Sequence, residues 1–130
     1  MNIAKSILLI FLGAGTGATI RWALSLLLNS MTSVIDVGTL TANYLGCFIM
    51  GIVTGIFFSF PNISSDVKVF LVTGFLGALT TFSSFSGEVI SRLMGQHYLN
   101  GLFVIIAHVG GSLTFTILGI ILWRVLSTAL

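Results

Sequence analysis

The chain has 130 residues, of which 56% are hydrophobic and only 6% are charged, and its mean hydropathy is +1.16. Soluble domains carry about 25% charged residues, so five basic and three acidic residues exclude a soluble globular fold and predict a protein that folds in lipid. The net charge of +2 is too small to indicate a nucleic-acid partner, and the single cysteine, Cys47, excludes an intrachain disulfide.

Four apolar stretches are long enough to cross a membrane, which takes about 20 residues per helix. They cover residues 3–28, 38–60, 67–94 and 102–126, with short separators. The sequence therefore predicts an all-α membrane protein, with one four-helix transmembrane domain over residues 1–130. A cleaved signal peptide at the amino terminus is the less favoured alternative, because the first apolar run continues through Leu28.

The first two spans carry glycines at small-xxx-small spacing. Gly13 and Gly17 lie in the first span, and Gly51 and Gly55 lie in the second. This spacing lets two helix backbones approach closely. It fits association into a homodimer, and it fits helix packing within one subunit equally well.

The second span begins with polar side chains at Thr39, Thr41 and Asn43. The Asn43 amide has two hydrogens to donate, and unpaired donors are costly in lipid. We therefore expect Asn43 to point into the bundle.

The third span is rich in residues that disfavour a helix. Residues 74–85 include two glycines, two threonines and two serines; glycine is flexible, and hydroxyls compete for backbone groups. A break inside the hydrocarbon is tolerated only where it faces protein or a cavity. We predict a third helix broken near mid-membrane, between about Gly74 and Phe82, and buried at a subunit interface. A continuous helix whose hydroxyls bond the preceding turn is the alternative.

Two phenylalanines follow the predicted break. Phe82 and Phe85 are spaced i, i+3 and share one helix face, and they flank Ser83 and Ser84. Aromatic rings have a positive edge, so edges turned inward offer an anion weak electrostatic contact. Bulk packing against lipid or core is the ordinary alternative for such a pair.

The fourth span carries a polar stripe. His108, Ser112 and Thr116 repeat every four residues and lie on one helix face. A polar stripe in an apolar span faces the bundle or a water path. The alternative is that the hydroxyls bond carbonyls of their own helix.

The basic residues are nearly balanced between the two membrane sides. Lys5, Lys68 and Arg124 lie near the side of the termini, and Arg21 and Arg92 lie toward the other. Three against two gives the positive-inside rule little to act on. Dual topology with antiparallel pairing and a fixed orientation set by something else both remain open.

The groups available at depth are hydroxyls, an amide and aromatic edges, with Glu88 the one obvious carboxylate in the bundle. Cation pathways usually show acidic rings, so this inventory favours a small anion over a cation. The absence of Cys/His metal-ligand spacing argues against an enzyme.

The first three spans each contain one distinctive pattern: Gly17-Ala18-x-x-Arg21 in the first, Gly38-Thr39-Leu40-x-x-Asn43-x-x-Gly46 in the second, and Gly74-x-x-Gly77-x-x-Thr80-Thr81-Phe82-Ser83-x-Phe85 in the third. Together they resemble the Fluc (CrcB-type) fluoride channel family over essentially the whole chain. The resemblance, and not the composition, supplies the ion. It implies a multi-pass protein of the cell (inner) membrane that passively exports fluoride and relieves its toxicity. It also implies an antiparallel dual-topology homodimer with two pores.

The resemblance further implies roles for particular residues. Those roles are a fluoride pore lined by Asn43, Phe82, Phe85, Thr39, Ser83, Ser84, His108, Ser112 and Thr116; vestibules that contain Arg21 and Glu88; and a structural sodium ion held by the backbone carbonyls of Gly77 and Thr80.

Two other classes of protein share this size and layout. A small dual-topology drug/proton antiporter needs a membrane-buried carboxylate to couple protons to cationic drugs. An accessory membrane subunit has no transport activity of its own. Fluoride-selective, proton-independent flux through purified protein separates all three.

Overall fold

The computed structural model describes residues 2–129, which fold into helices joined by short loops. Four helical segments in it are long and apolar enough to cross a membrane: Ile3–Met31, Val37–Ser59, Ser65–Met94 and Tyr98–Thr128. The prediction of an all-helical protein with four helices suited to spanning a membrane is therefore confirmed.

These segments consist of eight helical elements. The long ones are α1 (Ile3–Leu28), α2 (Val37–Ser59), α5 (Phe82–Met94) and α6 (Tyr98–Thr128), and a 3₁₀ turn, η1 (Asn29–Met31), follows α1. The third span begins with α3 (Ser65–Lys68), widens into the π-helix η2 (Val69–Leu76) and narrows again in α4 (Gly77–Leu79) before α5.

Local sequence signals explain where several helices begin and end. The Asn2 side chain accepts hydrogen bonds from the backbone nitrogens of Ala4 and Lys5 and caps α1. The Ser64 hydroxyl caps α3 in the same way. Helix α2 ends at Ser59, shortly before Pro61, whose ring cannot continue a helix.

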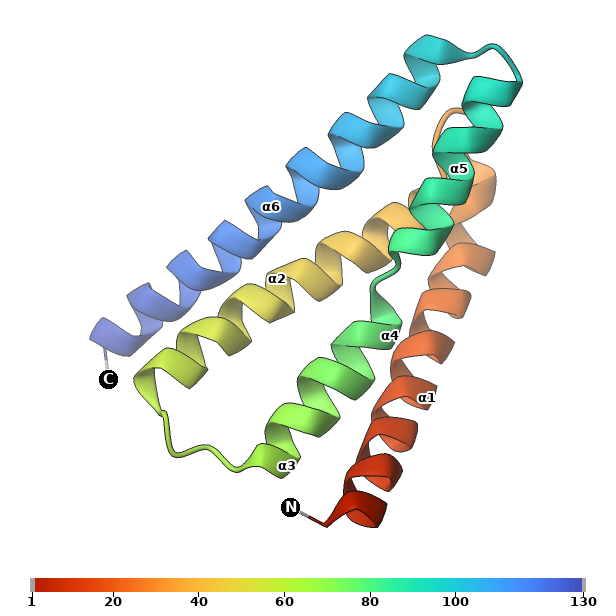
Figure 1. Cartoon of the computed structure of the whole chain (residues 1–130). Coiled ribbons are helices and arrows are strands. Elements are labelled where there is room, and N and C mark those ends of the chain that lie inside the picture. Colours follow the sequence, from red (N-terminus) through yellow and green to blue (C-terminus); the bar gives the residue numbers. More distant parts are fainter. Residues whose placement is uncertain (1, 130) are drawn as a thin grey trace.

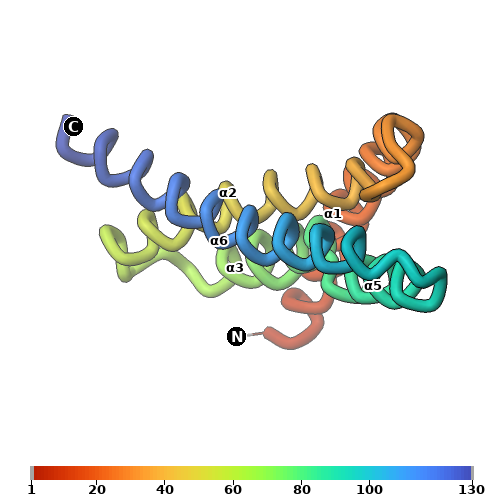
Figure 2. Tube along the Cα trace, turned by 90° about the horizontal axis from the view of Figure 1, so that it is seen from above, coloured from red at the N-terminus to blue at the C-terminus, as the bar shows by residue number. Residues whose placement is uncertain are grey.

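The helices form two packed pairs (Figure 1). Helices α2 and α6 run side by side, and α1 packs along η2 and α4. Helix α5 leaves the line of α4 and packs on α6. The view from above in Figure 2 shows that the bundle is elongated. The start of α1 and the end of α6 lie toward the same end of the bundle, as four spans require.

Glycines permit the close approach in both pairs. A Cβ added at Gly13 would lie 2.5 Å from the Phe70 carbonyl oxygen and 2.9 Å from the Phe75 nitrogen in η2. One added at Gly51 would overlap the Thr116 carbonyl oxygen in α6. These glycines of the small-xxx-small pairs are therefore used for helix packing inside the subunit.

Few side chains are fully buried. The largest are Leu76, Leu79 and Val104. A cluster on the α5–α6 side, which includes Phe85 and Val104, holds α5 against α6. Most other large apolar side chains are exposed, which suits a protein whose solvent is lipid.

Candidate functional site

The backbone is extended at Thr80 and Thr81, between α4 and α5. Helix α4 ends at Leu79, the ψ angle of Thr80 is 153°, and Thr81 has φ −147° and ψ 119°. The Thr81 hydroxyl accepts the Ser84 N–H at 3.1 Å and caps α5, which begins at Phe82. This segment lies within the stretch for which a break was predicted; its depth in a membrane and its burial at a subunit interface stay predictions.

Side chains accept hydrogen bonds from two backbone N–H groups at the junction of α4 and α5, those of Thr81 and Ser84. In a continuous helix the Thr81 N–H would bond the Gly77 carbonyl, and the Ser84 N–H would bond the Thr80 carbonyl. Here the Thr81 N–H donates to Asn43 Oδ1 at 2.8 Å, and the Ser84 N–H donates to the Thr81 hydroxyl. The carbonyls of Gly77 and Thr80 have therefore both lost their regular helical donors.

Asn43 lies at the centre of this arrangement. Its side chain is buried and reaches from α2 to the Thr80–Thr81 segment, where Nδ2 donates to the Thr81 carbonyl at 3.2 Å. The same Nδ2 lies 3.1 Å from Nδ1 of His108 on α6. The predicted inward orientation of Asn43 is therefore what the structure shows.

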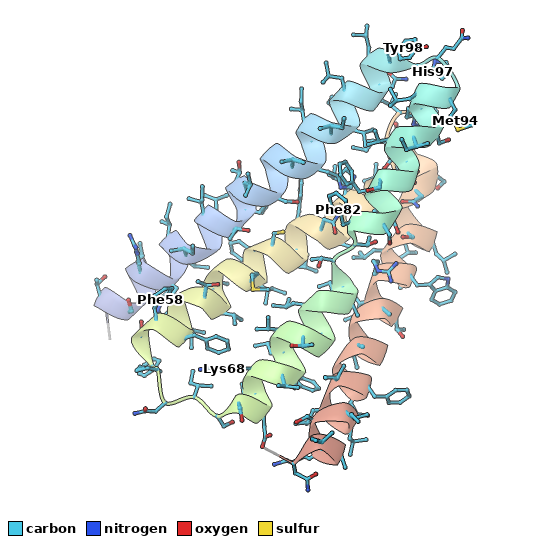
Figure 3. All side chains as sticks on the ribbon, viewed as in Figure 1. Phe58, Lys68, Phe82, Met94, His97 and Tyr98 are labelled. Atoms are coloured by element: carbon cyan, nitrogen blue, oxygen red, sulfur yellow. The ribbon has the colours of Figure 1, made fainter. Side chains whose placement is uncertain are left out.

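The two phenylalanines at the start of α5 are in very different surroundings. Their rings meet edge to face, with centroids 5.3 Å apart and planes at 68°. Phe85 is buried and packs on the His108 ring at 4.9 Å, whereas Phe82 is 77% exposed. Figure 3 labels Phe82 at the first turn of α5.

These side chains border one cavity of about 310 Å³. It brings together five of the nine predicted pore residues: Asn43, Phe82, Phe85, His108 and Ser112. The remaining lining consists of Cys47, Thr80, Thr81, Val109 and Leu113. None of the lining residues is Asp, Glu, Lys or Arg, so the lining consists of phenyl rings, an imidazole, an amide, hydroxyls, a thiol and apolar groups.

Four predicted pore residues are absent from this lining. The hydroxyls of Ser83 and Ser84 lie against the Thr81 hydroxyl at 3.2 and 3.1 Å. The Thr116 hydroxyl donates to the Ser112 carbonyl of its own helix at 3.0 Å, and Thr39 is buried in α2, one turn before Asn43. The structure thus gathers part of the predicted polar track and leaves the rest outside this cavity.

The two residues predicted at the vestibules make specific protein contacts. Arg21 Nε donates to the Ala78 carbonyl at 2.9 Å, next to the end of α4. Glu88 is only 6% exposed; its Oε1 accepts the Asp36 N–H at 2.8 Å, and Arg92 Nη2 lies 3.7 Å from the same oxygen. Glu88 therefore links α5 to the start of α2.

Two of the five lining residues that were not predicted for the pore carry a signal in the sequence. Thr81 precedes the first residue of a helix and is followed three residues later by the amide it caps, which is the ordinary signal of an N-cap. Cys47 follows Asn43 by four residues and so shares its helix face. Both signals were present in the sequence.

The chain matches known proteins over nearly its whole length. Residues 8–120 match the family model described as "CrcB-like protein, Camphor Resistance (CrcB)". The chain is 48% identical over 124 residues to a protein of Pasteurella multocida (strain Pm70) named "Fluoride-specific ion channel FluC", covering 95% of this chain and 97% of the relative. A protein of Haemophilus influenzae (strain PittGG) with the same name is 47% identical over 126 residues, covering 97% and 98%. A third of that name, from Ralstonia pickettii (strain 12J), is 43% identical over 107 residues, covering 82% and 85%.

Proposed function

The chain belongs to the CrcB-like family, and on that premise we propose that it is a passive, fluoride-selective channel that exports fluoride and relieves fluoride toxicity. The chain is a multi-pass protein of the cell membrane and an ion channel by family, not an enzyme. The observation that carries the proposal is the cavity beside the Thr80–Thr81 segment, where Asn43, Phe82, Phe85 and Ser112 meet.

The chemistry of this cavity suits a small, strongly hydrated anion. A pore must replace the water around such an ion with closely placed donors, yet must also let the ion leave. Among residues 2–129, the cavity lining contains neither Lys nor Arg, so no fixed positive charge from them would trap the ion there. The amide of Asn43, the hydroxyl of Ser112 and the phenyl rings, with their partially positive edges, carry no net charge. An anion can therefore bind to these groups and leave them again. We extend the track to Thr39, Ser83, Ser84, His108 and Thr116, the other polar residues that the resemblance implies.

The aromatic lining can be tested by substitution. We expect Phe82→Ile and Phe85→Ile to slow fluoride efflux from proteoliposomes about tenfold, since each removes a ring edge worth about 1 kcal/mol or more to the passing ion. Phe58→Ile is the matched control, because Phe58 is 85% exposed and does not line the cavity. Phe82 is exposed, so its loss leaves the core intact and the efflux change reports on the pore. Undiminished efflux in both variants would remove the rings from the mechanism.

We also propose an antiparallel, dual-topology homodimer with two pores. Its support is the nearly even distribution of basic residues over the two sides and the exposure of Phe82 at the cavity. The glycines at positions 13 and 51 do not add support, since they pack against helices of their own subunit. Chemical crosslinking in native membranes tests the proposal, and recovery of monomer alone would refute it.

A structural sodium ion on the dimer axis is the third part of the proposal. The carbonyls of Gly77 and Thr80 suit a hard cation. The Thr81 and Ser84 N–H groups, which would bond these carbonyls in a continuous helix, donate to side chains and leave the carbonyls available. Two copies would supply four oxygen ligands, and the ion would pin the subunits together. We expect a higher unfolding temperature in Na⁺ than in N-methylglucamine at equal ionic strength. Equal temperatures would argue against a bound sodium ion.

The antiporter and the accessory subunit are the alternatives that remain. Glu88 is a buried carboxylate, as a proton-coupled antiporter needs, but its Oε1 is held by the Asp36 N–H and lies near Arg92. Fluoride efflux from proteoliposomes that is independent of a proton gradient would exclude both.

A further inference from the structure

A row of buried polar groups connects α5, α6 and α2 beside the cavity. Glu88, His108 and Asn43 are 6%, 3% and 8% exposed. Glu88 Oε2 lies 3.7 Å from Nε2 of His108, and Nδ1 of His108 lies 3.1 Å from Asn43 Nδ2. The row ends at the backbone of Thr81, to which Asn43 is bonded.

The hydrogen bonds of Asn43 fix the roles in this row. Because the Thr81 N–H can only donate, the side-chain atom of Asn43 that it meets at 2.8 Å must be the oxygen. The atom that faces His108 is therefore the NH₂ group, which can only donate. His108 Nδ1 is then the acceptor, so the imidazole is neutral and carries its proton on Nε2.

Glu88 favours the same tautomer. The distance of 3.7 Å between Oε2 and His108 Nε2 is too long for a hydrogen bond, but it sets a carboxylate oxygen opposite the protonated nitrogen. Within residues 2–129, neither atom has a hydrogen-bond partner. The Asp36 N–H and Arg92 hold the other carboxylate oxygen and so keep Glu88 in this position.

Both amide hydrogens of Asn43 are thus taken, one by the Thr81 carbonyl and one by His108. We propose that His108 is a positioning residue of the pore. Its Nδ1 accepts a hydrogen bond from the Asn43 amide while no ion is present, and fluoride replaces it as the acceptor when an ion arrives. A buried donor without a partner is costly, and an anion is a stronger acceptor than a neutral imidazole. The Asn43 N–H therefore changes its hydrogen-bond acceptor from His108 to the ion as the ion arrives, and it bonds His108 again as the ion leaves. This inference deepens the proposed function and rests on it.

Three variants of His108 separate this role from simple packing. In His108→Asn the amide oxygen can occupy the position of Nδ1 and accept from Asn43. In His108→Gln the amide lies one bond farther out, in the position of Nε2, so the group that faces Glu88 is kept and the acceptor for Asn43 is lost. His108→Leu removes both. Size-exclusion elution of each variant in detergent shows whether it is folded.

The acceptor role predicts a specific order of effects on fluoride efflux. His108→Leu and His108→Gln leave Asn43 with a free donor, which should hold fluoride about tenfold more tightly and release it about tenfold more slowly. We therefore expect a lower half-saturating fluoride concentration together with a lower maximal rate. His108→Asn should restore most of both values. If His108→Asn behaves as His108→Leu does while wild-type efflux is normal, the inference is wrong and the proposed function stands; absence of wild-type efflux would refute the proposed function itself.

Nitrogen NMR gives a readout that does not depend on transport. In protein labelled with ¹⁵N-histidine, comparison with His108→Asn separates the signal of His108 from that of His97. We expect an unprotonated Nδ1 and a protonated Nε2, and we expect fluoride, but not an equal concentration of chloride, to shift the Nδ1 resonance. A proton on Nδ1, or no response to fluoride, would overturn the proposal.

Discussion

Gly13 allows a close backbone contact between α1 and η2, and its replacement by alanine has a calculable effect. The added Cβ would lie 2.5 Å from the Phe70 carbonyl oxygen, whereas ordinary van der Waals contact begins at 3.4 Å. Its other near neighbours, the Phe75 nitrogen at 2.9 Å and the Gly74 carbonyl carbon at 3.2 Å, are also backbone atoms. None of them can rotate away, so the helices must separate by about 0.9 Å.

Such overpacking of a well-packed contact costs about 1–3 kcal/mol. Gly15→Ala is the matched control, because Gly15 lies two residues away in α1 and an added Cβ there meets nothing within 4 Å. Both substitutions gain the same helix propensity, so their difference isolates the contact. We expect Gly13→Ala to be less stable than Gly15→Ala by about 1–3 kcal/mol, or roughly 4–12 °C in unfolding temperature for a chain of this size.

Thermal unfolding in detergent, followed by the fluorescence of Trp22 and Trp123, measures this difference. Equal unfolding temperatures for the two variants would mean that α1 and η2 are not packed as described. A large loss in Gly15→Ala would show instead that the open side of α1 is covered by something other than lipid.

Two further predictions concern the segment between α4 and α5 and the end of the bundle. A Cβ at Gly46 would overlap the methyl group of Thr80, and the Thr80 side chain is fixed because its hydroxyl donates to the Leu76 carbonyl. Gly46→Ala should therefore slow fluoride efflux about tenfold, whereas Gly110→Ala, where the added Cβ meets nothing within 4 Å, should not. Equal efflux from the two variants would count against the role of Thr80. Lys5 pairs with Asp66 at an exposed site, so Lys5→Ala should change the unfolding free energy by less than about 1 kcal/mol, and a larger loss would refute that estimate.

The four spans were predictable because lipid imposes a length and a composition on any helix that crosses it. The meeting of Asn43 with the phenylalanine pair was anticipated only as a shared inward orientation. The bond from Asn43 Oδ1 to the Thr81 N–H joins residues 38 positions apart, and periodicity within one helix carries no information about such a contact. The bond from Glu88 to the Asp36 N–H, across 52 positions, was beyond sequence reasoning for the same reason.

The polar stripe of α6 shows a different limit. His108, Ser112 and Thr116 share a helix face, yet only His108 and Ser112 line the cavity. Helices α2 and α6 cross where Gly51 meets the backbone of Thr116 and Gly119, so that part of α6 is packed against α2. Periodicity shows that polar residues share one face of a helix. Where that helix packs against its neighbour determines how many of those residues reach the cavity.

Asn43 connects the two proposed ion sites through one side chain. Its Oδ1 takes the donor that a continuous helix would give to the Gly77 carbonyl, and its Nδ2 faces the cavity and His108. A substitution there changes the proposed sodium ligand and the proposed fluoride contact together, so its effect on transport cannot be assigned to either. Phe82 and His108 line the cavity and are not among the proposed sodium ligands, whereas the atoms nearest to a Cβ added at Gly46 belong to Thr80 and Leu79. Comparing these positions therefore separates loss of the ion path from loss of the structure that holds it.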